Sequence, residues 1–460
     1  MPLKPRIHKT NNAAADIVQK TCSNGVTLIA EPIEAVRTAA IGFWFSCGSR
    51  YEKAGHRGVS HFAEHMLFKG TKSRSAFDIA AAFDRMGGYA NAFTEREQVC
   101  LYCVVPAVYA RNALDILCDM TENSVFPDSE LERERSVIES EIIASSDDPE
   151  EAALDAVAEI LWPDNPLSLP IAGTVEDVQS LSADFLRSWY AEFFQQGELT
   201  VCISGNIDIF EMQNRLEKMK NRNLSLQAGR HTEKNCHGKK SGAKKPGCTF
   251  ECSSFCVKTE NTDKDKAGRV HFITADFRQE QFFMLYPLSF PFSLKDYYCW
   301  AVLNALIGDT MSSRLFQALR EKSGYCYTVY SFFSMYADCG YWCAYACAPK
   351  KNAADIISTV RAELALLVKN GFSADEVQAA KEHVCGEEII NAEDTEYRMK
   401  RLARCRFFGF PQTAFDDSLQ AVRDLSAQAL SESLHRLLNP QYEKLVVYGP
   451  KLSAAVRKKK

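Results

Sequence analysis

Three residues within one short segment have the types and the spacing of a metal site. The segment Gly58 to Thr71 contains the pattern His-x-x-Glu-His, formed by His61, Glu64 and His65. In a helix, at roughly 100° per residue, the two histidines lie within about 40° of each other and Glu64 falls beside them. Neutral imidazoles bind zinc, and a neighbouring carboxylate can act as a base. The segment therefore predicts a zinc site with a carboxylate next to it.

The same pattern has a simpler interpretation, in which the three residues lie on a solvated helix face and make i,i+4 contacts. The chain has nine histidines in 460 residues. The chance occurrence of this pattern is on the order of one per cent or less. The metal site is therefore the stronger hypothesis.

A catalytic zinc ion needs a third protein ligand from elsewhere in the chain. The helix expected over Leu131 to Ala144 carries Glu134 and Glu141, seven residues apart and therefore on one face of an otherwise apolar helix. Either carboxylate could reach the metal, while the other would hold a histidine by its free ring N–H. Spacing alone does not choose between Glu134 and Glu141.

The composition is that of a folded protein, with 46% hydrophobic and 25% charged residues, and 460 residues suffice for two or three domains. The net charge of -5 gives no indication of nucleic-acid binding. We therefore expect no nucleic-acid partner.

Apolar runs and cysteines bear on the compartment. No uncharged apolar run reaches the roughly eighteen residues of a membrane span, and residues 1–8 lack the apolar core of a signal peptide. The 17 cysteines are scattered through apolar segments, which favours reduced thiols over a disulfide framework. We expect no membrane partner and a cytoplasmic protein, with the mitochondrial matrix as the lesser alternative.

The chain also contains an internal duplication. Val178–Leu186 is echoed by Val422–Leu430, and each passage opens a helix with a serine cap. The alternating strand Leu199–Gly205 is answered in the same order by Glu443–Gly449. The chain therefore consists of two copies of one unit.

Each unit is expected to belong to the α+β class, as an antiparallel sheet with helices packed on one face. Residues 227–266 break all apolar periodicity and are rich in lysine, cysteine and histidine, so they are predicted to be a linker. The predicted domains are residues 1–226, which carry the metal site, and residues 267–460, which lack its motif.

With these motifs, the sequence resembles the inverzincin peptidases of the pitrilysin and mitochondrial processing peptidase family, most of all its short two-domain type. The resemblance implies one zinc ion per chain with His61, His65 and Glu141 as ligands. It implies that Glu134 holds a ligand histidine and that Glu64 is the catalytic base. The implied activity is zinc-dependent endopeptidase action, in which Glu64 takes a proton from water and passes it to the leaving amine.

The same resemblance implies where a peptide substrate binds. The segment Gly87–Thr94 resembles the edge strand to which the substrate adds as a further strand, with Asn91, Ala92 and Phe93 in contact with it. Glu151 and Asp155 match acidic positions that receive a basic residue near the cleavage site.

In the second half, the resemblance implies that Arg320 and Tyr327 donate hydrogen bonds to the substrate carbonyl or the oxyanion. Family members of this length pair into dimers, which would bring these two residues to the zinc site of the other chain. A homodimer is expected, with a heterodimer as the alternative. The rival function is a scaffold or regulatory subunit of the same fold without catalysis.

Overall fold

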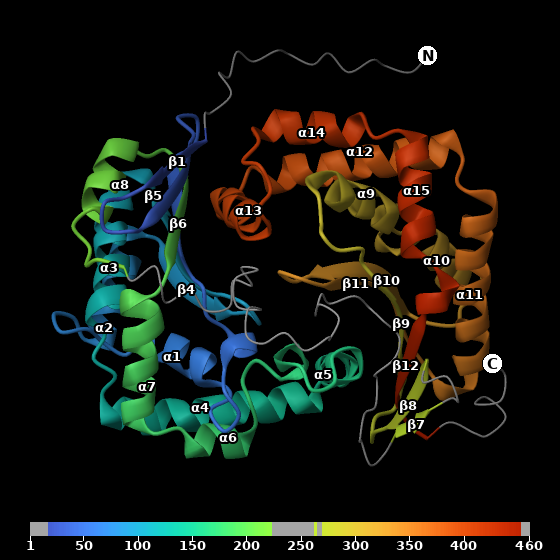
Figure 1. The fold of residues 1–460 in the computed structure, drawn as a ribbon, viewed down its shortest axis with the longest axis horizontal. Coiled ribbons are helices and arrows are strands. Elements are labelled where there is room, and N and C mark those ends of the chain that lie inside the picture. Colours follow the sequence, from blue (N-terminus) through green and yellow to red (C-terminus); the bar gives the residue numbers. More distant parts are fainter. Residues whose placement is uncertain (1–16, 223–261, 265–268, 452–460) are drawn as a thin grey trace, which may run out of the picture.

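The computed structural model describes residues 17–222, 262–264 and 269–451. Two units of similar build lie side by side in Figure 1, one on each side of the molecule. Of the linker predicted over 227–266, the structure describes Thr262–Lys264, which forms strand β7. The cysteines and the two histidines of that range lie outside the described residues.

The first unit is built on a six-stranded sheet of order β1-β2-β6-β3-β5-β4. Its strands are β1 Val18–Thr21, β2 Thr27–Pro32, β3 Thr38–Phe45, β4 Tyr89–Thr94, β5 Val99–Pro106 and β6 Leu199–Gly205. All neighbours pair antiparallel except β2 and β6, which are parallel. The expected sheet-and-helix unit is confirmed, but the expectation of a wholly antiparallel sheet was wrong for this pair.

Helices cover one face of this sheet (Figure 1). They are α1 Val59–Leu67, α2 Ala76–Met86, α3 Ala110–Asn123, α4 Asp128–Asp147, α6 Val175–Ser180, α7 Ala183–Trp189 with its π-helical continuation Tyr190–Gln196, and α8 Ile209–Leu216. Side-chain caps fix several of their starts; the predicted Ser182 cap accepts from the N–H of Phe185. The core between sheet and helices contains fully buried Phe43, Phe62 and Leu117.

The second unit repeats this plan with a sheet of order β7-β8-β12-β9-β11-β10. Its strands beyond β7 are β8 Val270–Thr274, β9 Glu280–Pro287, β10 Thr328–Met335, β11 Gly340–Ala348 and β12 Lys444–Gly449. Its helices are α9 Leu294–Asn304, α10 Arg314–Phe316 with its π-helical continuation Gln317–Lys322, α11 Ala353–Asn370, α12 Ala374–Asn391, α13 Thr395–Phe408, α14 Phe415–Arg423 and α15 Ala427–Leu437. Among the described strands of this sheet, β8 and β12 form the one parallel pair, as β2 and β6 do in the first sheet. The serine cap expected for the second copy is Ser426, which starts α15.

The second face of each sheet is covered by a helix from the other unit. Helix α13 of the second unit packs on the first sheet, where Met399 and Leu402 are fully buried against Trp44 and Cys202. Burying such a side chain contributes about 1.5–3 kcal/mol. The helices that cover a sheet from its own unit lie on one face, as expected, and the second face takes a helix from the other unit because the strands are apolar on both faces.

Helix α5, Pro149–Leu161, makes the reciprocal contact. Val157 and Leu161 pack on the second sheet against Phe283 and Tyr345. The two units thus exchange helices, and α5 and α13 lie between the sheets in Figure 1. Within the ranges that the structure describes, no helix is both long and apolar enough to cross a membrane.

Candidate metal centre

Helix α1, which carries the His-x-x-Glu-His motif, is held at its start by a buried glutamate. Glu52 accepts hydrogen bonds from the backbone N–H groups of Gly58 at 2.7 Å and Ser60 at 2.8 Å. The first N–H groups of a helix have no partner within it. Burial raises the pKa of Glu52 to about 7, although both hydrogen bonds act to lower it. Gly58 has a φ of 77°, and a Cβ there would lie 2.2 Å from the carbonyl oxygen of Ala172, so glycine is required.

At the other end of α1, the ring of His65 is oriented by a carboxylate. Its Nδ1 lies 3.1 Å from Glu134 Oε2, and the second oxygen of Glu134 lies 2.6 Å from Lys69 Nζ. A proton on Nδ1 directed at Glu134 leaves the lone pair of His65 on Nε2. Nε2 is therefore the atom of His65 that can bind a metal.

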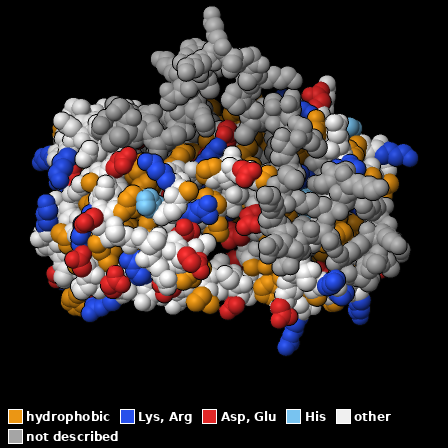
Figure 2. All heavy atoms as spheres, turned by 60° about the horizontal axis from the view of Figure 1, so that its bottom comes forward, with side chains coloured by type: hydrophobic (Ala, Val, Ile, Leu, Met, Phe, Trp, Pro, Cys, Tyr) orange, Lys and Arg blue, Asp and Glu red, His pale blue; other side chains and the backbone are white. Residues whose placement is uncertain are grey.

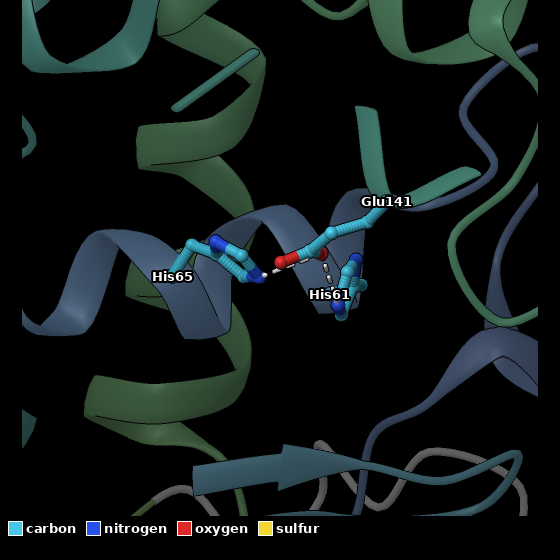
Figure 3. Close-up of side chains that lie close together, drawn as sticks. All are labelled: His61, His65 and Glu141. Atoms are coloured by element: carbon cyan, nitrogen blue, oxygen red, sulfur yellow. Dashed lines mark ion pairs between the residues drawn. The ribbon is translucent and has the colours of Figure 1, made fainter. Parts of the chain in front are cut away.

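Helix α4 places Glu141 opposite both histidines. Glu141 Oε2 lies 3.7 Å from His61 Nε2 and 3.5 Å from His65 Nε2. One atom from each of the three residues falls within 4.8 Å of the others. Figure 3 shows both rings on α1 directed at the carboxylate of Glu141. The side chain of Glu141 is 48% exposed, so the cluster is open to solvent on this side.

The donor set fits a zinc ion. Ligands about 2.1 Å from zinc in tetrahedral geometry lie about 3.4 Å from one another, close to the separations of Glu141 from the two histidines. Burial, and next the charge of His65, lower the pKa of His61 to about 4, so His61 is neutral at pH 7 and can act as a ligand. Two nitrogens and one oxygen leave a fourth position open, as catalytic zinc sites require.

Glu64 lies beside this cluster and is 9% exposed. Its Oε2 accepts a hydrogen bond of 2.6 Å from the hydroxyl of Thr94 on β4. Burial raises the pKa of Glu64, and the Thr94 bond partly opposes that rise. A buried carboxylate with a raised pKa is suited to take and return a proton.

The residues predicted to bind peptide lie on β4, the last strand of its sheet. Asn91 is exposed, and Ala92 packs partly against the core that includes α1. Phe93 lies on the opposite face, in edge contact with Trp44 at 5.5 Å between ring centroids and with Lys400 of α13 over its ring. The side chains of Ala92 and Phe93 therefore face different environments.

The structure brings Arg320 and Tyr327 together, but not to the metal cluster. The guanidinium of Arg320 lies 4.5 Å from the ring centroid of Tyr327, and Tyr327 is 78% exposed. Arg320 lies in the π-helical continuation of α10, and Tyr327 directly precedes β10. Figure 1 places α10 and β10 on the side of the molecule opposite α1.

The predicted acidic pair lies on α5, the exchanged helix. Glu151 is exposed in its first turn, whereas Asp155 is partly buried and lies 3.6 Å from Arg96. Burial raises the pKa of Asp155, and Arg96 opposes that rise. Figure 2 turns the edge with α4 to α6 forward, where side chains of both signs alternate and acidic ones gather near the middle.

Three residues around α1 were not predicted from the sequence to have a role: Glu52, Lys69 and Thr94. Lys69 lies within the motif segment and Thr94 within the predicted edge strand. Both segments were identified from the sequence, but no role was assigned to either residue. Glu52 precedes the motif, and its contact with the start of α1 depends on the fold of the intervening loop. Local patterns could not have identified it.

Two family models match this chain in succession. Residues 28–175 match "Insulinase (Peptidase family M16)", and residues 180–384 match "Peptidase M16 inactive domain". Both models belong to the M16 peptidases, and the second is described as an inactive domain.

Curated relatives agree with these models over nearly the whole chain. An uncharacterized zinc protease of Streptomyces coelicolor is 31% identical over 430 residues, which cover 91% of this chain and 86% of the relative. One of Bacillus subtilis is 30% identical over 426 residues, covering 93% of this chain and 97% of the relative. The chain therefore belongs to peptidase family M16, the insulinase family.

Solved structures share the fold at lower identity. A protease from Helicobacter pylori superposes with a TM-score of 0.79 at 19% identity, covering 95% of this chain and 100% of that chain. A chain of complex III2 from Candida albicans gives a TM-score of 0.71 at 17% identity, covering 94% and 96%.

Proposed function

We propose that this protein is a zinc-dependent endopeptidase that hydrolyses peptides or unfolded segments bound as an extended strand. The observation that carries the proposal is the convergence of His61, His65 and Glu141 beside the buried Glu64. Membership of a family whose curated relatives are named zinc proteases supports it.

Each residue of the metal cluster would have a separate role in hydrolysis. A zinc ion, one per chain, would supply Lewis-acid polarisation of the scissile carbonyl and make a water molecule more acidic. His61, His65 and Glu141 would hold the ion, and Glu134 orients the ring of His65. Glu64 would take the proton from water and deliver it to the leaving amine.

Strand β4 would bind the substrate. It ends the sheet, so its outer backbone groups have no neighbouring strand among the described residues. A peptide lying antiparallel or parallel to it would gain main-chain hydrogen bonds with little dependence on sequence. Asn91 is exposed on this strand and would contact the backbone of the peptide, beside Ala92 and Phe93.

A basic residue near the cleavage site would be preferred. Glu151 is exposed on α5, the helix that follows α4 and Glu141, and Asp155 lies one turn further on. Replacing an arginine in a good substrate by glutamine should lower kcat/KM for the wild type and change it little for Glu151→Gln. Equal losses in both proteins would refute this role of Glu151.

We also propose a homodimer in which Arg320 and Tyr327 act on the site of the partner chain. This proposal is supported by their place on the side of the molecule opposite α1. Glu64→Gln and Arg320→Ala chains should each be inactive alone. Mixed, they should regain activity, because one site of the heterodimer then has both residues. If mixing restores nothing while sedimentation shows dimers, Arg320 does not act across the dimer.

A scaffold or regulatory subunit is the competing function, supported by the structural likeness to a chain of complex III2. The two proposals separate in one experiment: bound metal and cleavage of a quenched, arginine-containing peptide of about 15–25 residues, a length that a strand-binding site can engage. We expect about one zinc ion and cleavage for the wild type. For Glu64→Gln we expect retained zinc and kcat about 10²- to 10⁴-fold lower. A wild type without zinc or cleavage would favour the scaffold.

A further inference from the structure

Strand β4 carries a side chain that touches the proposed base. Side chains alternate between the two faces of a strand, and Ala90 and Ala92 pack against the core that includes α1. Thr94 continues this series, and its Oγ1 donates to Glu64 Oε2 at 2.6 Å. The strand with the open edge and the base are therefore in direct contact.

The hydroxyl of Thr94 is the hydrogen-bond donor that the structure gives to Glu64. Within the described ranges, Glu64 forms no ion pair with a lysine or arginine, although it is 9% exposed. A glutamate side chain has three rotatable bonds, and each rotamer places its oxygens differently. With Oε2 engaged by Thr94, one orientation of the carboxylate is favoured and Oε1 is left for the proton.

The position of the donor is itself well fixed. Threonine is branched at Cβ, which restricts its χ1. Thr94 pairs with Val99 of β5, and the next residue, Glu95, donates its backbone N–H to Gln98 at 2.7 Å to close the hairpin. The hydroxyl is thus placed by the hairpin and does not depend on a flexible loop.

We propose that Thr94 is a positioning residue that holds Glu64 in its working orientation and aligns it with a peptide bound along β4. The inference rests on the proposed function. Glu64 lies on α1, so the bond from Thr94 couples the base to the strand that would bind the substrate backbone. Thr94 would act through its hydrogen bond to Glu64.

Steady-state kinetics of Thr94→Val and Thr94→Ser test this role. Valine keeps the shape and the strand preference of threonine but has no hydroxyl. A hydrogen bond to a charged group is lost, so kcat should fall about 10- to 100-fold, with KM within about 2-fold and bound zinc unchanged. Serine retains the hydroxyl and should restore kcat to within about 3-fold of the wild type.

A matched control is available in the same unit. Thr71 Oγ1 donates to Asp119 Oδ2 at 2.7 Å, far from β4 in sequence and with no contact to the metal cluster. Thr71→Val removes the same kind of hydroxyl–carboxylate bond, together with the hydrogen bonds that Thr71 Oγ1 accepts from the backbone N–H groups of Ser73 and Arg74. It should leave kcat and KM within about 2-fold of the wild type. An equal loss of kcat in Thr71→Val would overturn the proposal.

Crystal structures of metal-free wild type and Thr94→Val provide a readout independent of catalysis. We expect one Glu64 conformer in the wild type and more than one in the valine variant. The proposal is overturned if Thr94→Val keeps full kcat, loses zinc together with activity, raises KM alone, or shows the same single conformer of Glu64. A zinc-loaded wild type that cleaves no peptide would instead refute the proposed function, and with it any catalytic role for Thr94.

Discussion

The first and second units are held by matching contacts at equivalent places. In α4, Arg135 donates to the carbonyl oxygens of Val178 and Leu181 at the end of α6. In α12, Lys381 donates to those of Arg423 and Leu425 at the end of α14. A cation on one helix satisfies the last carbonyls of another in both units, although the residue type differs.

The edge strands match as well. Tyr89 of β4 donates to Glu396 of the exchanged helix α13, and Tyr330 of β10 donates to Glu150 of the exchanged helix α5. The scaffold is therefore duplicated in its sheet order, its helix exchange and its polar contacts.

The units differ in the first α-helix of each, α1 in the first unit and α9 in the second. Counted from their N-caps, Cys299 and Trp300 of α9 take the places of Glu64 and His65 of α1, and both are buried in the apolar core of the second unit. Glu387 of α12 occupies the position equivalent to Glu141 of α4. Its Oε1 lies 3.4 Å from His383 Nε2 on the same helix. Thus one scaffold supports a polar cluster in one unit and packed apolar side chains in the other.

The exchanged helices give the largest expected effect. Leu161→Ala in α5 and Leu402→Ala in α13 should each lower the free energy of unfolding by about 2–5 kcal/mol, because each side chain is almost wholly buried. Urea unfolding followed by circular dichroism measures both. A large loss for one variant and none for the other would show that only one unit depends on the exchange.

The proposed ligand Glu141 tests the difference between the units most directly. Glu141→Ala should weaken zinc binding about 100-fold or more, since even residues that only support a ligand cost 10- to 100-fold. Competition with a chromogenic chelator gives the affinity. Glu387→Ala, the equivalent change in α12, should leave it unaltered, and a matching loss there would mean that zinc binds elsewhere.

Glu134 should have a smaller effect than Glu141. Glu134→Gln replaces the carboxylate by an uncharged amide, so His65 Nδ1 loses its charged partner and Lys69 loses its ion pair. Zinc affinity should therefore fall about 10- to 100-fold. The same chelator competition applies, with Glu132→Gln on the exposed side of α4 as the control. No change in Glu134→Gln would show that His65 needs no carboxylate to orient its ring.

The edge-strand tyrosines give the smallest effect. Tyr89→Phe and Tyr330→Phe each remove one hydrogen bond to a glutamate of an exchanged helix. Each should cost about 0.5–1.5 kcal/mol of unfolding free energy, measurable by thermal unfolding. Similar values would strengthen the equivalence of the two edges, and a loss in Tyr330→Phe alone would weaken it.

Periodicity explains why much of this arrangement is predictable from the sequence. Helical spacing places His61, Glu64 and His65 on one face, and the recurrence of capped helix and strand near each end of the chain reveals two units. Spacing could not separate Glu134 from Glu141, because the difference depends on which ring nitrogen each oxygen faces.

Contacts between segments distant in the sequence could not be predicted from these local patterns. The helix exchange joins Leu402 to the first sheet and Leu161 to the second, and nothing in either helix indicates which sheet it covers. Likewise Glu52 and Thr94 reach α1 through loops and a hairpin whose paths local sequence does not determine.

The exchange of α5 and α13 has the geometry of a domain-swapped dimer made within one polypeptide. Two such units on separate chains would cover their sheets only after meeting in solution, so their stability would depend on concentration. Joining them in one chain makes the meeting intramolecular and gives each unit a high effective concentration of its partner. Each unit alone would leave the second face of its sheet uncovered, so we expect folding of the two to be a single cooperative event.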